Sequence, residues 1–220
     1  MDQTLSMEEY LKPTAFYELS DSALLSFVNG VMKGGSPVEK AVKLYYAIRD
    51  GWRYDPYQIK LEPEALKVST LMARSDGHCI DKAILLIAAC RVVGIPARLC
   101  LAKVRNHIAA ERMTATFGTD ELVPHGYAEL WLNGKWVKAT PAFNKELCDR
   151  LGVAPLEFDG HSDSLFQEFD QSGGTFMEYL DEYGAFADVP LERMRALMQR
   201  HYPEAYENYL KHGKLILKEA

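Results

Sequence analysis

The chain has 220 residues, 48% of them hydrophobic, and carries 25 Lys and Arg against 31 Asp and Glu. This length and composition predict a soluble globular protein with a sizeable core, and the formal net charge of -6 argues against a general binder of nucleic acid or anionic membranes, which need a basic surface. The sequence shows neither a membrane span nor a signal peptide, so we expect a cytoplasmic protein.

The first part of the chain reads as helices followed by an extended segment. A helix is expected after Ser20, and Ser36-Pro37-Val38-Glu39 is a capping box that predicts a second helix ending near Gly51. Residues 52–57 lead into a proline and read as extended, and residues 63–74 look like short helical turns.

The clearest element runs from Cys79 to Val93. It is apolar nearly all round in its middle, which is typical of a helix buried at the centre of a domain, and Gly94 and Pro96 end it. A strand is expected at 97–104.

A polar connector at 105–123, with a short helix at 109–116, is expected to precede a hairpin. Asn133-Gly134 lies between alternating apolar runs at 127–132 and 135–140, a strong hairpin signal. His125 would then lie just ahead of the first hairpin strand.

The remainder of the chain is predicted to be mostly helical. Pro190 and Pro203 resemble first-turn residues of two C-terminal helices. We therefore expect a core at 1–145 with N-terminal helices and an extension at 146–220 packed on it. A tail of this length could cover one side of a cleft and limit the substrate to a small molecule or a chain end.

Cys79 is the best candidate for a nucleophile. The four cysteines have no CxxC spacing, so a disulfide framework is not expected, and a free cysteine is most often a small buried residue. Cys79, however, begins a helix, where free N–H groups and the positive end of the dipole favour a thiolate. Cys90, Cys100 and Cys148 lack such a setting.

His125 is the candidate base, because cysteine catalysis needs a histidine close in space. The competing interpretation is a structural histidine. His78, next to Cys79, would point about 100° away on a helix and could at most support the site.

Several motifs together resemble the transglutaminase-like superfamily across about residues 10–145. They are Gly77-His78-Cys79, the helix through Arg91, Gly94-Ile95-Pro96-Ala97-Arg98, His125-Gly126-Tyr127-Ala128-Glu129-Leu130-Trp131, Gly134-Lys135-Trp136 and Thr140-Pro141. The resemblance implies a papain-like α+β fold, in which a central helix begins with the cysteine and packs on an antiparallel sheet that carries the histidine and a carboxylate.

One position departs from that family. Members usually place an aspartate before the proline of the second hairpin strand, where this chain has Thr140. Its hydroxyl could orient the imidazole but carries no charge to stabilise an imidazolium. Asn144 and then Asp159 are the next candidates, while Glu129 would lie about 13 Å along the strand from His125.

An oxyanion hole would need the Cys79 N–H and a side-chain donor. The resemblance suggests Trp52 or Tyr54, although both could simply be core aromatics. Arg105, in the connector, could bind a substrate carboxylate or be a solvated surface residue.

No zinc-type spacing links Cys79, His78, Asp81 and His125, so we expect neither a metal nor a cofactor. The expected partner is a peptide, a protein chain end or a small amide, with no nucleic acid and no membrane. The sequence does not set the oligomeric state.

Three functions fit these observations. The first is hydrolysis or acyl transfer at an amide or isopeptide bond through an acyl-enzyme on Cys79. The alternative from another class is a binding or scaffold module that kept the fold and lost the chemistry, which Thr140 favours. A third is an acyltransferase using a thioester donor, although the chain has no Gly-rich phosphate-binding motif.

Overall fold

The structure, a computed structural model, describes residues 6–56, 59–107, 114, 117–165 and 177–213. Its elements in chain order are η1 (Met7–Leu11), α1 (Ser22–Val31), α2 (Pro37–Gly51), β1 (Arg53–Tyr54), η2 (Pro63–Leu66), α3 (Val68–Met72), β2 (Asp76–Gly77), α4 (Cys79–Val92), β3 (Ala97–Asn106), β4 (Glu121–Leu132), β5 (Lys135–Ala139), α6 (Lys145–Leu151), β6 (Met177–Phe186), α7 (Leu191–His201) and α8 (Pro203–His212).

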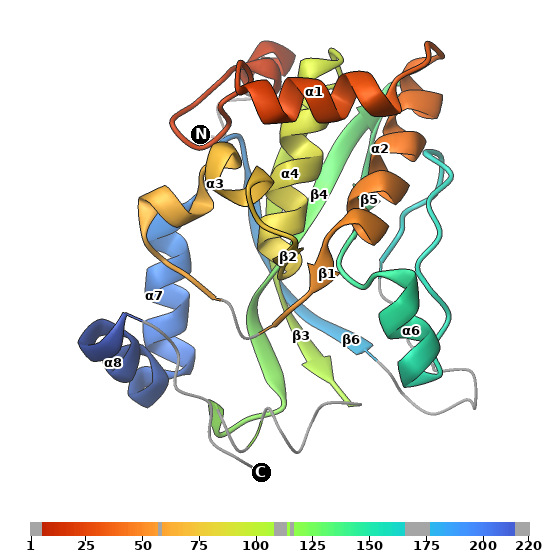
Figure 1. Ribbon diagram of the computed structural model, residues 1–220. Coiled ribbons are helices and arrows are strands. Elements are labelled where there is room, and N and C mark those ends of the chain that lie inside the picture. The colour runs from red at the N-terminus through yellow and green to blue at the C-terminus, as the bar shows by residue number, and fades with distance from the viewer. Residues whose placement is uncertain (1–5, 57–58, 108–113, 115–116, 166–176, 214–220) are drawn as a thin grey trace.

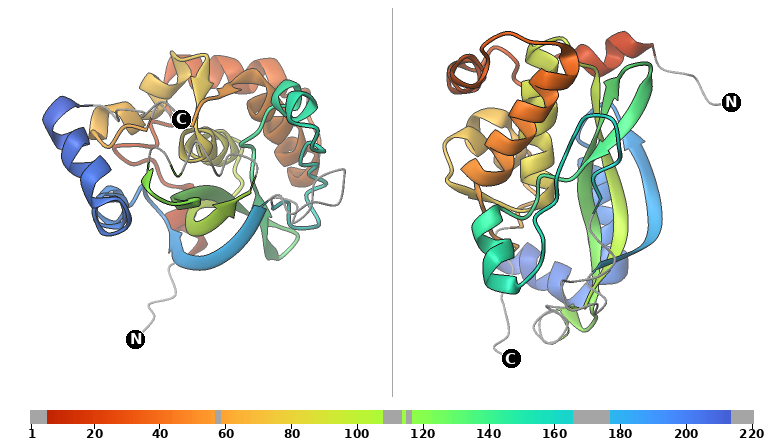
Figure 2. Two further views of the ribbon diagram at one scale, coloured as in Figure 1. Left: turned by 90° about the horizontal axis from the view of Figure 1, so that it is seen from below. Right: turned by 90° about the vertical axis from the view of Figure 1, so that its right-hand side faces the viewer.

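Helix α4 is the centre of the molecule. Every residue from Cys79 to Arg91 is buried, as the apolar run predicts. The helix lies between a four-stranded antiparallel sheet on one side and α1, α2 and α3 on the other (Figures 1 and 2). The predicted α+β architecture, with a central helix on an antiparallel sheet and extra helices at both ends, is confirmed.

The sheet has the order β5-β4-β3-β6. The β4–β5 hairpin turns at Asn133 and Gly134, which both have positive φ, as the Asn-Gly signal predicts. The capping box of α2 and the two C-terminal helices are also confirmed.

Strand β4 is longer than the sequence predicts. It starts at Glu121, so His125 lies within the strand and not ahead of it. Pro124 hid this extension, because proline inside an apolar run argues against a strand. The predicted helix at 109–116 falls mostly outside the described residues.

The segment after residue 145 is also more than a helical extension. Strand β6 pairs with β3 along most of its length, from Leu99↔Phe186 to Asn106↔Met177. The sequence of β6 carries no clear strand signal, because it contains residue types that are depleted in strands: Glu178, Asp181, Glu182 and Gly184. Charged side chains are nevertheless usual on an edge strand, which β6 is.

Candidate active site

The first turn of α4 is built by a histidine cap. His78 Nδ1 accepts hydrogen bonds from the backbone N–H groups of Ile80 (3.1 Å) and Asp81 (3.4 Å), and Asp81 Oδ2 accepts the His78 N–H (3.2 Å). His78 Nε2 lies 3.5 Å from Asp81 Oδ1. Both ring nitrogens of His78 are thus engaged in the helix start, and burial lowers its pKa.

Cys79 is the first residue of that helix and is buried, with 4% of its surface exposed. Burial raises the pKa of its thiol to about 11, while hydrogen bonds from the backbone N–H groups of Gly126, Ile80 and Cys79 itself oppose this rise. The backbone N–H groups at the helix start therefore lower the pKa of the thiol, as expected, but loss of hydration raises it by more.

The backbone N–H of Gly126, a residue of β4, acts on the Cys79 thiol, so the start of α4 lies next to this strand. Strand β5 stops at Ala139, opposite Ala128, so it does not cover the strand edge at Gly126. A Cβ on Gly126 would lie 2.5 Å from Ile80 Cγ1 and 3.0 Å from Ile80 Cα. Only glycine lets the strand approach the start of α4 this closely, and it follows His125 directly.

His125 is fully buried in β4. Burial lowers the pKa of its imidazole to about 3, with a smaller contribution from nearby His78. Its Nε2 lies 3.3 Å from the hydroxyl of Tyr179 on β6, and the two rings pack edge to face with centroids 5.8 Å apart. Tyr179 reaches across β3, where the residue paired with His125 is the small Ala102.

Thr140 does not provide the contact expected of it. The residue is buried directly after β5, and among the described residues its Oγ1 has no hydrogen-bond partner, so it is not bonded to His125. Continuing the β4–β5 register puts Thr140 opposite Tyr127, diagonal to His125. A threonine hydroxyl is one bond shorter than an aspartate carboxylate and does not span that diagonal.

The other proposed orienting residues have other partners. Asn144 is the N-cap residue of α6, and its amide oxygen accepts the Tyr54 N–H (3.0 Å). Asp159 is exposed and accepts two N–H groups of its own loop, and Glu129 accepts a hydrogen bond from Arg98 (2.6 Å).

Trp52 and Tyr54 differ in position. The Trp52 indole N–H donates to the Leu71 carbonyl (3.3 Å), which commits it to the core and makes it a poor oxyanion donor. Tyr54 lies on β1, beside β2 and the start of α4, and lines a pocket together with Cys79.

Arg105 is held by carboxylates. Its guanidinium lies 3.4 Å from Asp120, 3.3 Å from Glu121 and 3.2 Å from Glu178, and it is not among the residues that line the pocket. These ion pairs fit a structural role, and binding of a substrate carboxylate by Arg105 stays a prediction.

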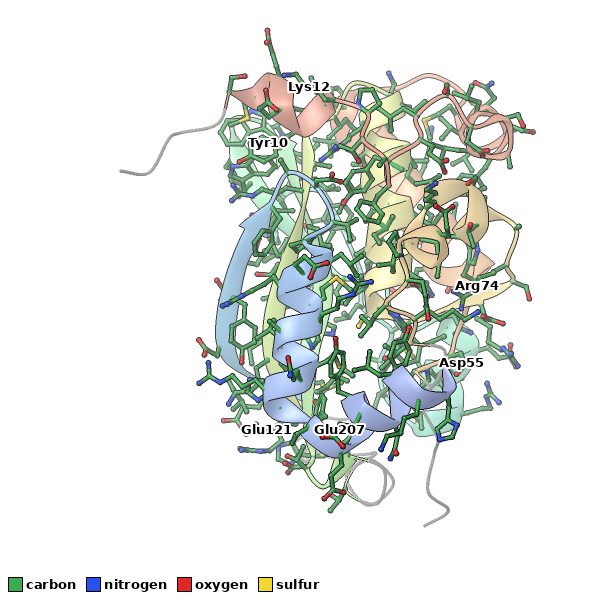
Figure 3. The ribbon with its side chains drawn as sticks, turned by 90° about the vertical axis from the view of Figure 1, so that its left-hand side faces the viewer. Tyr10, Lys12, Asp55, Arg74, Glu121 and Glu207 are labelled. Carbon is green, nitrogen blue, oxygen red and sulfur yellow. The ribbon has the colours of Figure 1, made fainter. Side chains whose placement is uncertain are left out.

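The pocket at Cys79 is small and opens to solvent, with a cavity volume of about 20 Å³. Its lining comes from four parts of the chain: β1 with the segment after it, the start of α4, residues 117–124 at the start of β4, and α7 with the residue that follows it. Figure 3 shows α7 and α8 on the side of the molecule that faces the viewer. The lining residues are Tyr54, Pro56, Ile59, Leu61, His78, Cys79, Ile80, Phe117, Leu122, Val123, Pro124, Met194, Met198 and Tyr202.

Several residues of the site and of the pocket lining were not predicted from the sequence. Tyr179 could not be found, because it reaches His125 only through the pairing of β6 with β3. Met194 and Met198 have helical spacing, but nothing local says which cavity they line. The pattern His78-x-x-Asp81 was visible as a capping box.

Within the described ranges, no helix is long and apolar enough to cross a membrane. In the same part of the chain, no group of three or more His, Cys, Asp or Glu side chains could hold a metal ion.

Comparison with known proteins identifies the family. The sequence pattern of the transglutaminase-like superfamily matches residues 26–141, more than half of the chain. The chain therefore belongs to this superfamily, and membership supports cysteine-based acyl transfer or hydrolysis as its general class of chemistry. No protein of curated function matches the sequence.

Two solved structures are similar in fold. Arylamine N-acetyltransferase from Salmonella typhimurium is 18% identical, with a TM-score of 0.50, and the match covers 91% of this chain and 74% of that one. The protein named "Putative Cysteine Protease" from Cytophaga hutchinsonii is also 18% identical, with a TM-score of 0.48 over 64% of this chain. This chain spans 43% of the length of the latter protein. The family match and the similarity to the acetyltransferase structure confirm the papain-like fold.

Proposed function

We propose that the protein is a cysteine enzyme that cleaves or transfers acyl groups at an amide bond, with Cys79 as nucleophile and His125 as base. One observation carries the proposal. The Cys79 sulfur lies at the start of α4, the backbone N–H of Gly126, the residue after His125, acts to lower its pKa, and Cys79 lines a pocket.

The reaction follows from these groups. Cys79 Sγ attacks the carbonyl carbon as His125 takes the thiol proton, and backbone N–H groups at the helix start stabilise the oxyanion. The carbon–nitrogen bond breaks, the amine leaves with the proton from His125, and a thioester forms on Cys79. Water then gives a carboxylic acid and the free thiol, whereas an amine acceptor gives a new amide.

Tyr179 supports this mechanism as a positioning residue. Its hydroxyl lies at Nε2 of His125, which would fix the ring orientation in place of the missing aspartate. Neither Thr140 nor Asn144 is hydrogen-bonded to the ring of His125 in the described residues, and Tyr54 is the remaining side-chain candidate for the oxyanion hole.

The substrate would be a peptide, a chain end or a small amide. All four cysteines are free thiols, as a reducing, cytoplasmic environment would leave them.

The test is acylation of Cys79 by butyryl p-nitroanilide, followed by release of p-nitroaniline and by intact-protein mass. We expect an acyl adduct that disappears in Cys79→Ala and forms at least about 100-fold more slowly in His125→Ala. Cys90→Ala is the matched control, because it removes another buried thiol from the same helix. Equal rates in wild type and His125→Ala would disprove the base assignment.

A second candidate is a binding module on the same fold. It is favoured by Thr140 at the aspartate position and by the burial that keeps Cys79 as a thiol and His125 neutral. If no acylating compound reacts at Cys79 in a His125-dependent way, this second function is the better one.

A further inference from the structure

The pocket at Cys79 is apolar in its chemistry. None of its lining residues is Lys, Arg, Asp or Glu, and most are aliphatic, aromatic, methionine or proline side chains. A group placed there beside the sulfur would contact hydrocarbon on most sides.

Two polar side chains of the wall, Tyr202 and His78, are already hydrogen-bonded within the protein. The Tyr202 hydroxyl donates to the Glu121 carbonyl (2.6 Å) and accepts the Val123 N–H (2.6 Å). His78 caps α4 through its ring. A charged substituent would therefore lose its water without gaining a partner, whereas each buried methylene should improve binding about fourfold.

One wall comes from the end of the chain, beyond the matched residues 26–141. Met194 and Met198 project from α7 one turn apart, and Tyr202 joins α7 to α8. Figure 3 shows α7 and α8 facing the viewer, with Glu121 labelled beside the lower end of α7 and Asp55 above α8.

Residues of the two C-terminal helices and their junction also form hydrogen bonds with two other parts of the lining. Tyr202 binds the start of β4, as described above. On the opposite side, Tyr209 accepts the Leu61 N–H (2.7 Å), and Arg195 donates to the Leu61 carbonyl (2.7 Å). The width of the pocket is thus fixed by α7 and α8.

We propose that this pocket is the acyl subsite: it takes short, uncharged apolar acyl groups, and Met194 and Met198 set the length accepted. The inference rests on the proposed function, since it names the group that Cys79 would carry as a thioester. The amine that leaves would lie outside the pocket.

The test uses p-nitrophenyl acetate, butyrate, hexanoate and hemisuccinate, with rates of Cys79 acylation by intact mass divided by the rates of each ester with glutathione. We expect butyrate to exceed acetate by about 16-fold, at fourfold per methylene, and hemisuccinate to fall at least about tenfold below butyrate. Met198→Ala should move the preference toward hexanoate.

Leu197→Ala is the matched control, because Leu197 is buried on the same helix but does not line the pocket. It should leave the chain-length profile unchanged. If acylation depends on His125 but shows no preference among the esters, or if Met198→Ala and Leu197→Ala behave alike, the subsite is wrong while the proposed function stands.

A binding experiment with Cys79→Ala tests the subsite independently of the reactivity of Cys79. We expect hexanamide, but not succinamate, to bind this variant in ligand-observed NMR, and Met198→Ala to change that affinity. Absence of hexanamide binding would overturn the subsite whatever the reactivity of Cys79. Selective binding together with an unreactive Cys79 would support the pocket and reject the chemistry.

Discussion

At the scale of single residues, burial sets the protonation of the candidate pair. It raises the pKa of Cys79 to about 11 and lowers that of His125 to about 3, so a thiol and a neutral imidazole coexist at neutral pH. The helix start and the Gly126 N–H then act mainly on the sulfur as it gains charge in the transition state. A thiolate formed in advance, which the helix start at Cys79 suggested, is not required.

The neutral state of His125 predicts acid sensitivity. Between pH 6.5 and 3 the unfolded chain binds a proton at His125 that the folded protein does not, so stability falls as the pH is lowered through this range. From pH 6.5 to 5 this should cost roughly 2 kcal/mol. Urea unfolding at both pH values should show a loss smaller by that amount in His125→Gln.

His161→Gln is the control, because His161 is exposed. Its loss of stability between the two pH values should equal that of the wild type. If His125→Gln also loses as much as the wild type, His125 is not neutral in the folded protein.

Tyr179 offers a second prediction at this scale. Tyr179→Phe removes the hydroxyl at His125 Nε2 but keeps the ring packing, and one hydrogen bond corresponds to about a tenfold loss in rate. We expect kcat to fall by that factor with KM unchanged in steady-state kinetics, because only the orientation of the base is affected.

Tyr183→Phe provides the comparison, since Tyr183 lies on the same strand and its hydroxyl is 3.2 Å from Nε2 of another histidine, His201. Its kinetics should match the wild type. A fall in kcat of similar size in both variants would mean that Tyr179 acts through general stability of β6.

At the scale of elements, two buried basic side chains, Lys82 and Arg91, hold α4 near its ends, and burial lowers the pKa of Lys82 to about 7. Lys82 is fully buried, and its Nζ donates to the carbonyls of Arg49 (2.7 Å), Trp52 (2.8 Å) and Ala142 (2.7 Å). Three acceptors match the three hydrogens of an ammonium group. Lys82 thereby ties the end of α2, the segment before β1 and the loop after β5 to the turn that carries Cys79.

Lys82→Met should test this role. The substitution leaves three buried carbonyl groups without their donor, which should lower the free energy of unfolding by at least about 3 kcal/mol. Urea denaturation followed by circular dichroism gives the value. Lys43→Met, at an exposed position of α2, should change it by less than about 0.5 kcal/mol, and a similarly small change in Lys82→Met would contradict the role.

The elements also show what the sequence could predict. Helix α4 and the β4–β5 hairpin were predictable because their signals are local: an apolar run that ends at Gly94, and an Asn-Gly pair. Strand β6 and the contact of Tyr179 with His125 depend on pairing between residues far apart, from Leu99↔Phe186 onward. Local motifs made Cys79 and His125 candidates for the site, whereas Met194 and Met198 join the pocket lining only through the folded structure.

At the scale of the whole molecule, the division at residue 145 separates parts that share one core. Strand β6 completes the sheet beside β3, and Leu191, Met194, Leu197 and Met198 of α7 belong to the same buried cluster as α4. Arg91, at the far end of α4, donates to carbonyls on both sides of the division, those of Lys12, Ala97 and Ala187.

This sharing predicts one cooperative unfolding transition. The three tryptophans, Trp52, Trp131 and Trp136, all lie before residue 145, so their fluorescence reports on the first part alone. Hydrogen exchange of the α7 amides, followed by mass spectrometry, reports on the part of the chain after residue 145. Because α7 packs against β4 and shares one buried cluster with α4, both signals should change at the same urea concentration, and the calorimetric and van't Hoff enthalpies should agree. Loss of α7 protection well below the tryptophan midpoint would show instead that the C-terminal segment folds as a separate unit, and the pocket wall would then be lost before the core.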